Sequence, residues 1–403
     1  MAGTIVIAAA LTTGGVARAS DRFVSRTGDD TGNACTSALA PCRTPAHAFA
    51  QSAPFDVIKV AKATYQGSVP VDVSTTIAIE GGWSPDFSVR DPARYRTTVG
   101  GIIEIRAGAG ETIDLTLDGL TLSEPSPGVA AVRVNTLGDG EVHIMVAHCV
   151  LERNEYAIQA DAYGTSTLEL DVVDSRLVKN LVGMRIRGFD TGTLTARVTR
   201  SEMRSNSGGM SALRYDSSVV DLQVLDSLVR SNRSTGLVAG GPVNVTLTNT
   251  AISKNKSGGI RIDGSTVLTA VNTTITGNRT RAEAGGSGIL IFLAASATLT
   301  NTIVWGNRAT VTGLDDIQML ANAGTVSAAF SDIGARHTLG GTFVDGGGNI
   351  SADPIVRGTV PRPRPGSPVI DTGTCAGAPV TDIDGDPRPT GPGCDMGADE
   401  VVP

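Results

Sequence analysis

A short phrase that ends in asparagine recurs through the middle of the chain, at steps of 26, 26, 26, 23, 23 and 29 residues. Three residues before each asparagine stands an aliphatic residue, and five before it a small one, as with Leu151 and Cys149 in the first copy. Positions two residues apart point to the same side of a strand, so the two columns predict strands with one buried face. The recurring residues are Asn154, Asn180, Asn206, Asn232, Asn255, Asn278 and Asn307.

Each copy continues with a glycine-containing bend and two further apolar runs, such as Gly183–Gly188 and "STLELDVVD". A unit of three short strands cannot bury its apolar face alone, but stacked copies can. The repeat therefore predicts an all-β parallel β-solenoid with three strands per coil and coils roughly 4.8 Å apart. The asparagines then form a ladder at a turn, where Asn tolerates left-handed geometry and its amide bonds to neighbouring coils. We expect this ladder to be structural.

The composition fits such a stack, because 40% of the residues are hydrophobic, only 4% are aromatic and 49 are glycine. The interior must therefore consist of aliphatic side chains between tight turns. Cys149 occupies the small-residue column, which predicts a buried structural thiol. Leucine-rich repeats share this period, but they need a helical return, whereas the returns here are short, β-branched and rich in glycine.

The repeat also divides the chain. Residues 1–19 are predicted to be a signal peptide, with a short apolar stretch and a small-residue cleavage motif before Ser20; an N-terminal strand is the alternative. Residues 20–55 are expected to form an N-terminal cap, and residues 56–352 the solenoid. Residues 353–403 are expected to close the far end.

A cap is needed because the end of a solenoid is an open sheet edge. The segment "TPAHAFAQS" predicts a short capping helix, with Thr44 as N-cap and Pro45 at the first helical position.

Four of the five cysteines lie in irregular segments, and they pair by proximity as Cys35 with Cys42 and Cys375 with Cys394. We interpret both pairs as disulfides, since no Cys or His cluster has the spacing of zinc ligands. Disulfides are typical of oxidising compartments, which predicts a secreted, extracellular or cell-surface protein.

The net charge of −7, with no long basic run, argues against a nucleic acid as the main partner. No segment is long enough to cross a bilayer, so we expect no membrane span. The expected partner is an extracellular polysaccharide or a cell-surface component, and the expected state is a monomer.

Three segments carry a family resemblance. The segment from "FVSRTGDDTGNACTS" to "VAKATYQG" resembles the opening module of secreted bacterial β-helix proteins, and "GGWSPDFSVRDPARYRTTVGG" resembles their second-coil loop. The segment "PGSPVIDTG…TDIDGDPRPTGPGCDMGADE" is similar to the closing segment of choice-of-anchor Q proteins. The resemblance implies the right-handed, single-stranded parallel β-helix of the pectin-lyase-like superfamily, at or outside a bacterial surface.

The second strand of each coil carries an outward series of arginines that could bind an acidic polysaccharide, because guanidinium groups match carboxylates. The alternative is that they are ordinary solvent-facing charges. The candidate ligand-binding residues are Arg133, Arg185, Arg187, Arg214 and Arg261, with Asp263 beside them.

Trp305 is a separate candidate, since an exposed indole can stack on a sugar ring. It shares its column with Arg204 and Arg230; the alternative is that it packs under the loop at residues 308–314.

Catalytic residues are not identifiable. The companions of the polygalacturonase carboxylates are missing, so Asp315 and Asp316 are expected in a solvated turn. The alternating Asp382, Asp384 and Asp386 suggest calcium, but Pro and Gly stand where an EF-hand needs Gly and Glu. We favour no metal or other cofactor there. Instead we expect a turn network in which Arg388 pairs with Asp395 or Glu400.

The sequence thus predicts a carbohydrate-binding or partner-binding β-helix protein without catalytic machinery. A polysaccharide lyase or glycoside hydrolase of the pectin-lyase-like type, acting on an acidic polysaccharide, is the alternative.

Overall fold

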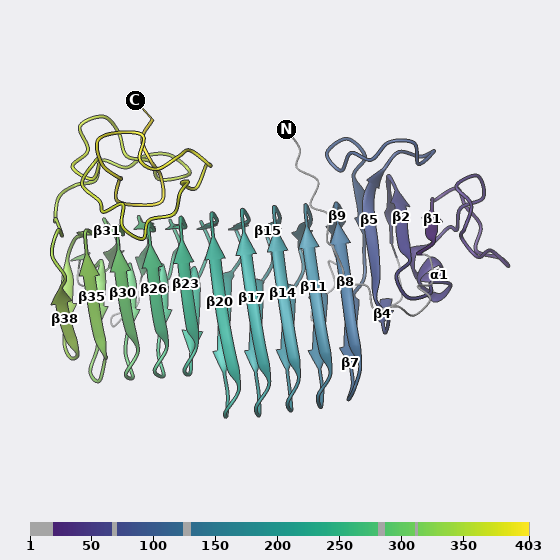
Figure 1. Cartoon of the computed structure of the whole chain (residues 1–403), viewed down its shortest axis with the longest axis horizontal. Coiled ribbons are helices and arrows are strands. Elements are labelled where there is room, and N and C mark those ends of the chain that lie inside the picture. The colour runs from purple at the N-terminus through teal and green to yellow at the C-terminus, as the bar shows by residue number, and fades with distance from the viewer. Residues whose placement is uncertain (1–18, 67–70, 124–129, 281–286, 311–312, 403) are drawn as a thin grey trace.

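The computed structural model describes residues 19–66, 71–123, 130–280, 287–310 and 313–402. All but the last residue of the predicted signal peptide therefore lies outside the described residues. The described chain winds into stacked coils whose strands build three long parallel sheets (Figure 1). Each full coil crosses them in one order, here called the first, second and third sheet. The predicted parallel β-solenoid with three strands per coil is confirmed.

The strands of the three sheets pair only with their equivalents in neighbouring coils. The first sheet has thirteen strands: β1 (Asp21–Val24), β2 (Val57–Ala61), β5 (Ile77–Trp83), β8 (Thr112–Asp118), β11 (Glu141–Ala147), β14 (Thr167–Val173), β17 (Thr193–Thr199), β20 (Val219–Leu225), β23 (Asn244–Thr248), β26 (Val267–Val271), β30 (Ser296–Thr300), β35 (Thr325–Ala329) and β38 (Thr342–Asp345). The second has eleven: β3 (Ala63–Tyr65), β6 (Thr97–Val99), β9 (Leu120–Leu122), β12 (Val150–Glu152), β15 (Arg176–Val178), β18 (Glu202–Arg204), β21 (Leu228–Arg230), β24 (Ala251–Ser253), β27 (Thr274–Thr276), β31 (Ile303–Trp305) and β36 (Asp332–Ile333). The third also has eleven: β4 (Val71–Val73), β7 (Ile103–Ala107), β10 (Ala130–Thr136), β13 (Tyr156–Ala162), β16 (Val182–Gly188), β19 (Gly208–Arg214), β22 (Leu237–Gly240), β25 (Ile260–Ile262), β29 (Ile289–Ile291), β34 (Ile317–Met319) and β37 (Arg336–Thr338). A small fourth sheet joins β28 (Arg279–Thr280), β32 (Arg308–Ala309) and β33 (Gly313–Leu314).

The aliphatic column of the repeat is one continuous interior ladder. Leu151 pairs with Leu177, which pairs with Met203, and Val229 and Ile252 follow in register. Each of these side chains is at most 1% exposed. Burying one such side chain contributes about 1.5–3 kcal/mol, so the stacked columns are the main source of stability.

The small-residue column lies beside the aliphatic one and is equally dry. Cys149 is 1% exposed, and burial raises the pKa of its thiol to about 12. The prediction of a buried structural thiol is confirmed.

The asparagines form a ladder inside the turn between the second and third sheets. The backbone N–H and the side-chain Nδ2 of Asn154 donate to Oδ1 of Asn180 at 2.9 and 3.0 Å. Nδ2 of Asn180 donates in turn to the carbonyl oxygen of Leu151 at 3.0 Å. The left-handed residue, however, is the one before each asparagine, such as Lys179 with φ of 59°. The Asn backbone is thereby turned so that its side chain stays inside the stack.

The ladder ends on an acid. The N–H and Nδ2 of Asn307 both donate to Oδ1 of Asp316 at 2.8 Å. Asp315 and Asp316 are 0% and 1% exposed, so the expectation of a solvated turn was wrong. Asp316 is buried because its carboxylate oxygen accepts the same two bonds that the next asparagine would have accepted.

The N-terminal end is capped as predicted. Helix α1 (Pro45–Ala50) begins after Thr44, whose side chain accepts a hydrogen bond from the N–H of His47. In Figure 1, α1 lies beside β1 and β2 at this end of the stack. The Cys35–Cys42 disulfide closes the loop before the helix.

The C-terminal segment, residues 353–402, follows the last coil. It folds back along the side of the coils, above the corner between the first and second sheets (Figure 1). Side chains at that corner hold it: Nδ2 of Asn272 donates to the carbonyl oxygen of Gly397 at 3.2 Å, and Nδ2 of Asn301 to that of Thr374 at 2.7 Å. These corner amides supply the polar partners that an irregular segment needs, which is why it packs there. The Cys375–Cys394 disulfide lies within it.

Candidate functional site

Arg133, Arg185, Arg187 and Arg261 lie on the outer face of the third sheet, in neighbouring columns. Arg214 instead ends its strand in register with Gly188 and the buried Ala162, in a column that faces the interior further along the sheet. Arg133, Arg185 and Arg261 belong to one column, in which Gln159, Ser211 and Val238 fill the intervening coils. The strand geometry explains this placement, because these residues alternate with buried aliphatic ones such as Ile186.

Arg187 lies in a second column, two residues further along the strands, and Asp263 continues this column after the last residue pair of its strand, Ala239 with Ile262. Arg187 is bound to Asp161 of the preceding coil by a bidentate ion pair, Nε to Oδ1 at 2.8 Å and Nη2 to Oδ2 at 2.6 Å. This hydrogen bonding holds the pKa of Arg187 above its usual range. Asp263 lies 3.5 Å from Arg261. The arginines of this face therefore differ in how far their charge is already neutralised.

Among the arginines on the outer face of the third sheet, Arg185 keeps most of its positive charge free of a partner. Its guanidinium carbon lies 4.1 Å from the centre of the Tyr156 ring, and its Nη1 donates to the Tyr156 hydroxyl at 2.8 Å. It has no carboxylate partner among the residues that the structure describes. Cation–π contact orients the group without cancelling its charge.

Aromatic rings gather at the edge of this face, where the third sheet turns towards the first. Tyr163, Phe189 and Tyr215 stack in successive coils, with ring centres 4.6 and 4.8 Å apart and planes within 4°. The chain has only five tyrosines, and three of them, counting Tyr156, lie here. Sequence reasoning missed this ladder, although its residues follow the third strand at a constant distance in three consecutive copies.

Arg214 ends β19 next to this ladder. Its Nη1 donates to the carbonyl oxygen of Pro242 at 3.2 Å, and within the described residues it too has no carboxylate partner. Arg185, Arg187 and Arg214 thus form one surface with the four rings, whereas Arg261 and Asp263 lie further along the stack.

Trp305 is not part of this surface. It ends β31 on the second sheet, in the same column as Arg204, Arg230, Ser253 and Thr276. The indole is half-buried against an apolar cluster that the C-terminal segment completes with Val369 and Met396.

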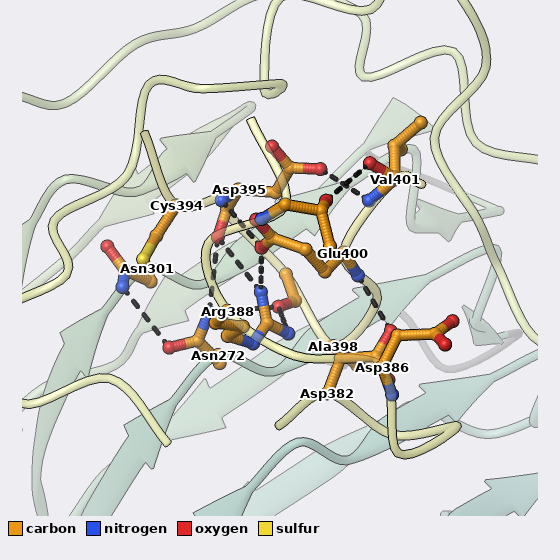
Figure 2. A network of polar contacts seen from close by, with 12 residues as sticks. Asn272, Asn301, Asp382, Asp386, Arg388, Cys394, Asp395, Ala398, Glu400 and Val401 are labelled. Atoms are coloured by element: carbon orange, nitrogen blue, oxygen red, sulfur yellow. Dashed lines mark hydrogen bonds and ion pairs between the residues drawn. The ribbon is translucent and has the colours of Figure 1, made fainter. Parts of the chain in front are cut away.

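A buried ion pair lies at the centre of the C-terminal segment (Figure 2). Nη1 of Arg388 lies 2.7 Å from Oε2 of Glu400, and both side chains are 1% exposed, which confirms one of the two expected pairings. Asp382 accepts hydrogen bonds from the N–H groups of Asp384, Asp386 and Glu400.

An acidic group does occur in this segment. Oxygens of Asp382, Asp384 and Asp399 lie within 4.8 Å of one another, a separation that would suit a metal ion. Asp382 already uses both oxygens on backbone amides, and Asp384 and Asp399 both pair with Arg362. The arrangement is therefore complete as a polar network.

A groove of about 330 Å³ lies on the second sheet, beneath the loop that follows β5. Its cations include Arg176 and Lys179, which have no ion-pair partner in the described ranges, and Arg96, which pairs with Glu152. None of the described residues that line it is aromatic. Sequence reasoning did not find this groove, because the loop and the sheet are joined only in the folded chain.

The comparisons with known proteins agree with the coil architecture. Residues 211–328 match the family model described as "Right handed beta helix region". Together with the parallel coils, this match identifies a right-handed parallel β-helix, the class of fold that the resemblance implied. No curated protein matches the chain.

Solved structures similar to this chain include three carbohydrate-related proteins, all of low sequence identity. A pectate lyase, Pel9A, is 11% identical with a TM-score of 0.49, covering 96% of this chain and 97% of its own. The periplasmic alginate epimerase AlgG is 9% identical with a TM-score of 0.41, covering 73% and 75%. A complex of XylC with xylose is 10% identical with a TM-score of 0.44, covering 95% and 98%.

No helix in the described part of the chain has the length and apolar character needed to cross a membrane.

Proposed function

We propose that this protein binds an acidic polysaccharide on the outer face of the third sheet, and that it does so without cleaving the chain. One observation carries the proposal. Arg185 and Arg214, which lack carboxylate partners among the described residues, stand beside four exposed or half-buried rings in a protein that is only 4% aromatic.

The chemistry of this surface suits a polymer of uronic acids. A guanidinium group forms paired hydrogen bonds with a carboxylate, and an aromatic ring packs against the apolar face of a pyranose. A sheet with coils about 4.8 Å apart offers a long, regular track for an extended chain.

Binding without cleavage is supported by the carboxylates of the same face. Asp161 is held in a bidentate pair with Arg187, and Asp263 faces Arg261. A general base needs a carboxylate free to take a proton from the substrate. Both acids are already occupied by cations, so these two carboxylates give no support to the alternative of a lyase or hydrolase.

We also propose that the protein works outside the cytoplasm, at or beyond a bacterial surface, as a protein of the choice-of-anchor Q type. The two disulfides support this location, since such bonds persist in oxidising compartments. The resemblance of the last segment supports the type, and the resemblance of the first segment supports secretion.

The test is the affinity of purified protein for polygalacturonate oligosaccharides, measured by calorimetry at low and moderate salt. Arg185→Ala should weaken binding about tenfold, the effect of losing one charge-assisted contact worth roughly 1.4 kcal/mol. The matched control is Arg197→Ala on the first sheet, which should leave the affinity unchanged.

Three outcomes would contradict the proposal. If Arg185→Ala binds like the Arg197→Ala control, the face is not the site. A loss confined to Arg176→Ala would place binding in the groove on the second sheet instead. Formation of an unsaturated product by the wild-type protein would show that the protein is a lyase.

A further inference from the structure

The length of the coil changes abruptly beside the aromatic ladder. Leu213 pairs with Gly240, and Asp221 pairs with Asn244, so the corner between these pairs shrinks from residues 214–220 to residues 241–243. Figure 1 shows the change as a step: the corners from β8 to β20 reach further down than those from β23 to β38. The sequence carries the same change, since the spacing of the ladder asparagines falls from 26 to 23 residues here.

Tyr215 is the last ring before this step. One face of the ring stacks on Phe189, with the ring centres 4.8 Å apart. The next coil has Gly240, Gly241 and Pro242 at the corner, so it supplies no aromatic side chain to cover the other face. Tyr215 is accordingly 43% exposed, although one face of its ring is covered by Phe189.

A cation lies directly before this ring in the chain. Arg214 precedes Tyr215, and its bond to the carbonyl oxygen of Pro242 directs its guanidinium across the step towards the shorter coil. Its Nε is buried without a hydrogen-bond partner in the described chain. An aromatic face with a guanidinium beside it provides two complementary contacts for one ligand unit, a ring and an acid.

We propose that the open face of Tyr215 is a sugar-stacking subsite, in which a uronic acid ring occupies the next position of the ladder and its carboxylate binds Arg214. This inference rests on the proposed function and adds where the bound chain is anchored and which unit is recognised. The sugar would continue the stack at about the 4.6–4.8 Å that separates the rings before it. The step thereby fixes the register of the polysaccharide along an otherwise repetitive face.

The experiment compares affinities for a uronic acid oligosaccharide and for a neutral glucan oligosaccharide of equal length. Tyr215→Ala should weaken binding of the acidic oligosaccharide about tenfold, the size expected for loss of one stacked ring. Tyr215→Phe keeps the ring face and should restore most of that affinity. Arg214→Ala should reduce the preference for the acidic over the neutral oligosaccharide, without the loss of ladder packing that Tyr215→Ala brings. Val267→Ala, an exposed apolar truncation on the first sheet, is the matched control.

The results separate the subsite from the proposed function. If Tyr215→Ala and Arg214→Ala both bind like the control while Arg185→Ala binds weakly, the subsite is refuted and the polysaccharide face stands. If all three bind like the control, both proposals fail. Should Tyr215→Phe bind as poorly as Tyr215→Ala, stacking is not the contact and the subsite is refuted.

Discussion

Asp332 lies inside the last coils, and only one of its two carboxylate oxygens has a hydrogen-bond partner among the described residues. It is 0% exposed, and Oδ1 accepts a hydrogen bond from the N–H of Ala352 at 3.0 Å. Oδ2 is buried without a hydrogen-bond partner among the described residues. Burial, with a smaller contribution from the charge of Asp316, raises the pKa of Asp332 to about 7. The fold therefore favours the protonated acid at this position.

The raised pKa makes stability depend on pH in a defined direction. Between about pH 4 and pH 7, the unfolded state loses this proton before the folded state does, so the free energy of unfolding falls as pH rises through this range and then levels off. Asp332→Asn removes the titration. We expect it to raise stability at pH 8 by on the order of 2–4 kcal/mol, and to change it little at pH 4.

The prediction is checked by measuring thermal unfolding of the wild-type protein and of Asp332→Asn from pH 4 to pH 8. Because other buried acids titrate in both proteins, the quantity to compare is the difference in melting temperature between them. A difference that does not grow with pH would show that Asp332 is already ionised in the folded protein.

Residue-scale predictions from the sequence succeeded where a residue sat in a repeat column. Cys149 was correctly predicted to be buried, because the aligned copies have small residues at the same position of neighbouring coils. Asp316 was not, because it follows Asn307 by nine residues rather than by a coil length, so no alignment column contains it. Its burial depends on the chain leaving the coil and returning to the end of the ladder.

At the scale of elements, the asparagine ladder joins each turn to the next. Asn206 is 0% exposed; its Oδ1 accepts two hydrogen bonds from Asn180, and its Nδ2 donates to the carbonyl oxygen of Leu177 at 2.9 Å. Truncation of Asn206 leaves buried donors on Asn180 and a buried acceptor on Leu177 without partners. Groups of this kind cost about 1–3 kcal/mol each when unsatisfied.

We therefore expect Asn206→Ala to lower the free energy of unfolding by at least ~3 kcal/mol. Asn244→Ala is the matched control, because Asn244 is exposed and makes one side-chain hydrogen bond to Asp221. Urea unfolding followed by circular dichroism should show a much larger shift for Asn206→Ala. Equal shifts would mean that neighbouring coils or water replace the lost bonds.

The elements themselves were predictable because their repeat is long and regular. The period, the aliphatic column and the ladder asparagines all follow from matching copies. The left-handed position was assigned one residue too late, since Arg153, Lys179, Ser205 and Ser231 share no residue type that would mark it. Backbone geometry at that position is imposed by the stacked coils rather than by the local sequence.

At the scale of the whole molecule, the C-terminal segment is a separate layer on one side of the coils. A column at the corner between the first and second sheets contains Asp174, Arg200 and Asp226 in the uncovered coils, and these are followed by Asn249, Asn272 and Asn301 beneath the segment. The change from charged residues to asparagines marks the covered surface. This change is visible in the sequence. It can be interpreted as a covered surface only when the structure shows that the C-terminal segment packs on this corner.

The buried pair of Arg388 and Glu400 holds this layer together. Nη2 of Arg388 also donates to the carbonyl oxygen of Gly397 at 3.1 Å and lies 3.5 Å from Oδ1 of Asn249, so the guanidinium links the segment to the coils. Removing one member of a buried ion pair leaves the other charge uncompensated, at a cost of about 3–5 kcal/mol.

We expect Arg388→Met to loosen the segment without unfolding the coils, because the coils have their own continuous interior. Limited proteolysis should then cut within residues 373–401, while hydrogen exchange in residues 130–280 stays as slow as in the wild type.

Arg388→Met combined with Glu400→Leu should recover part of the resistance to proteolysis, since no unpaired charge remains. Arg362→Ala, which removes a half-exposed cation that pairs with Asp384 and Asp399, should have a smaller effect. Faster exchange throughout the coils would instead show that the segment and the β-helix unfold as one unit.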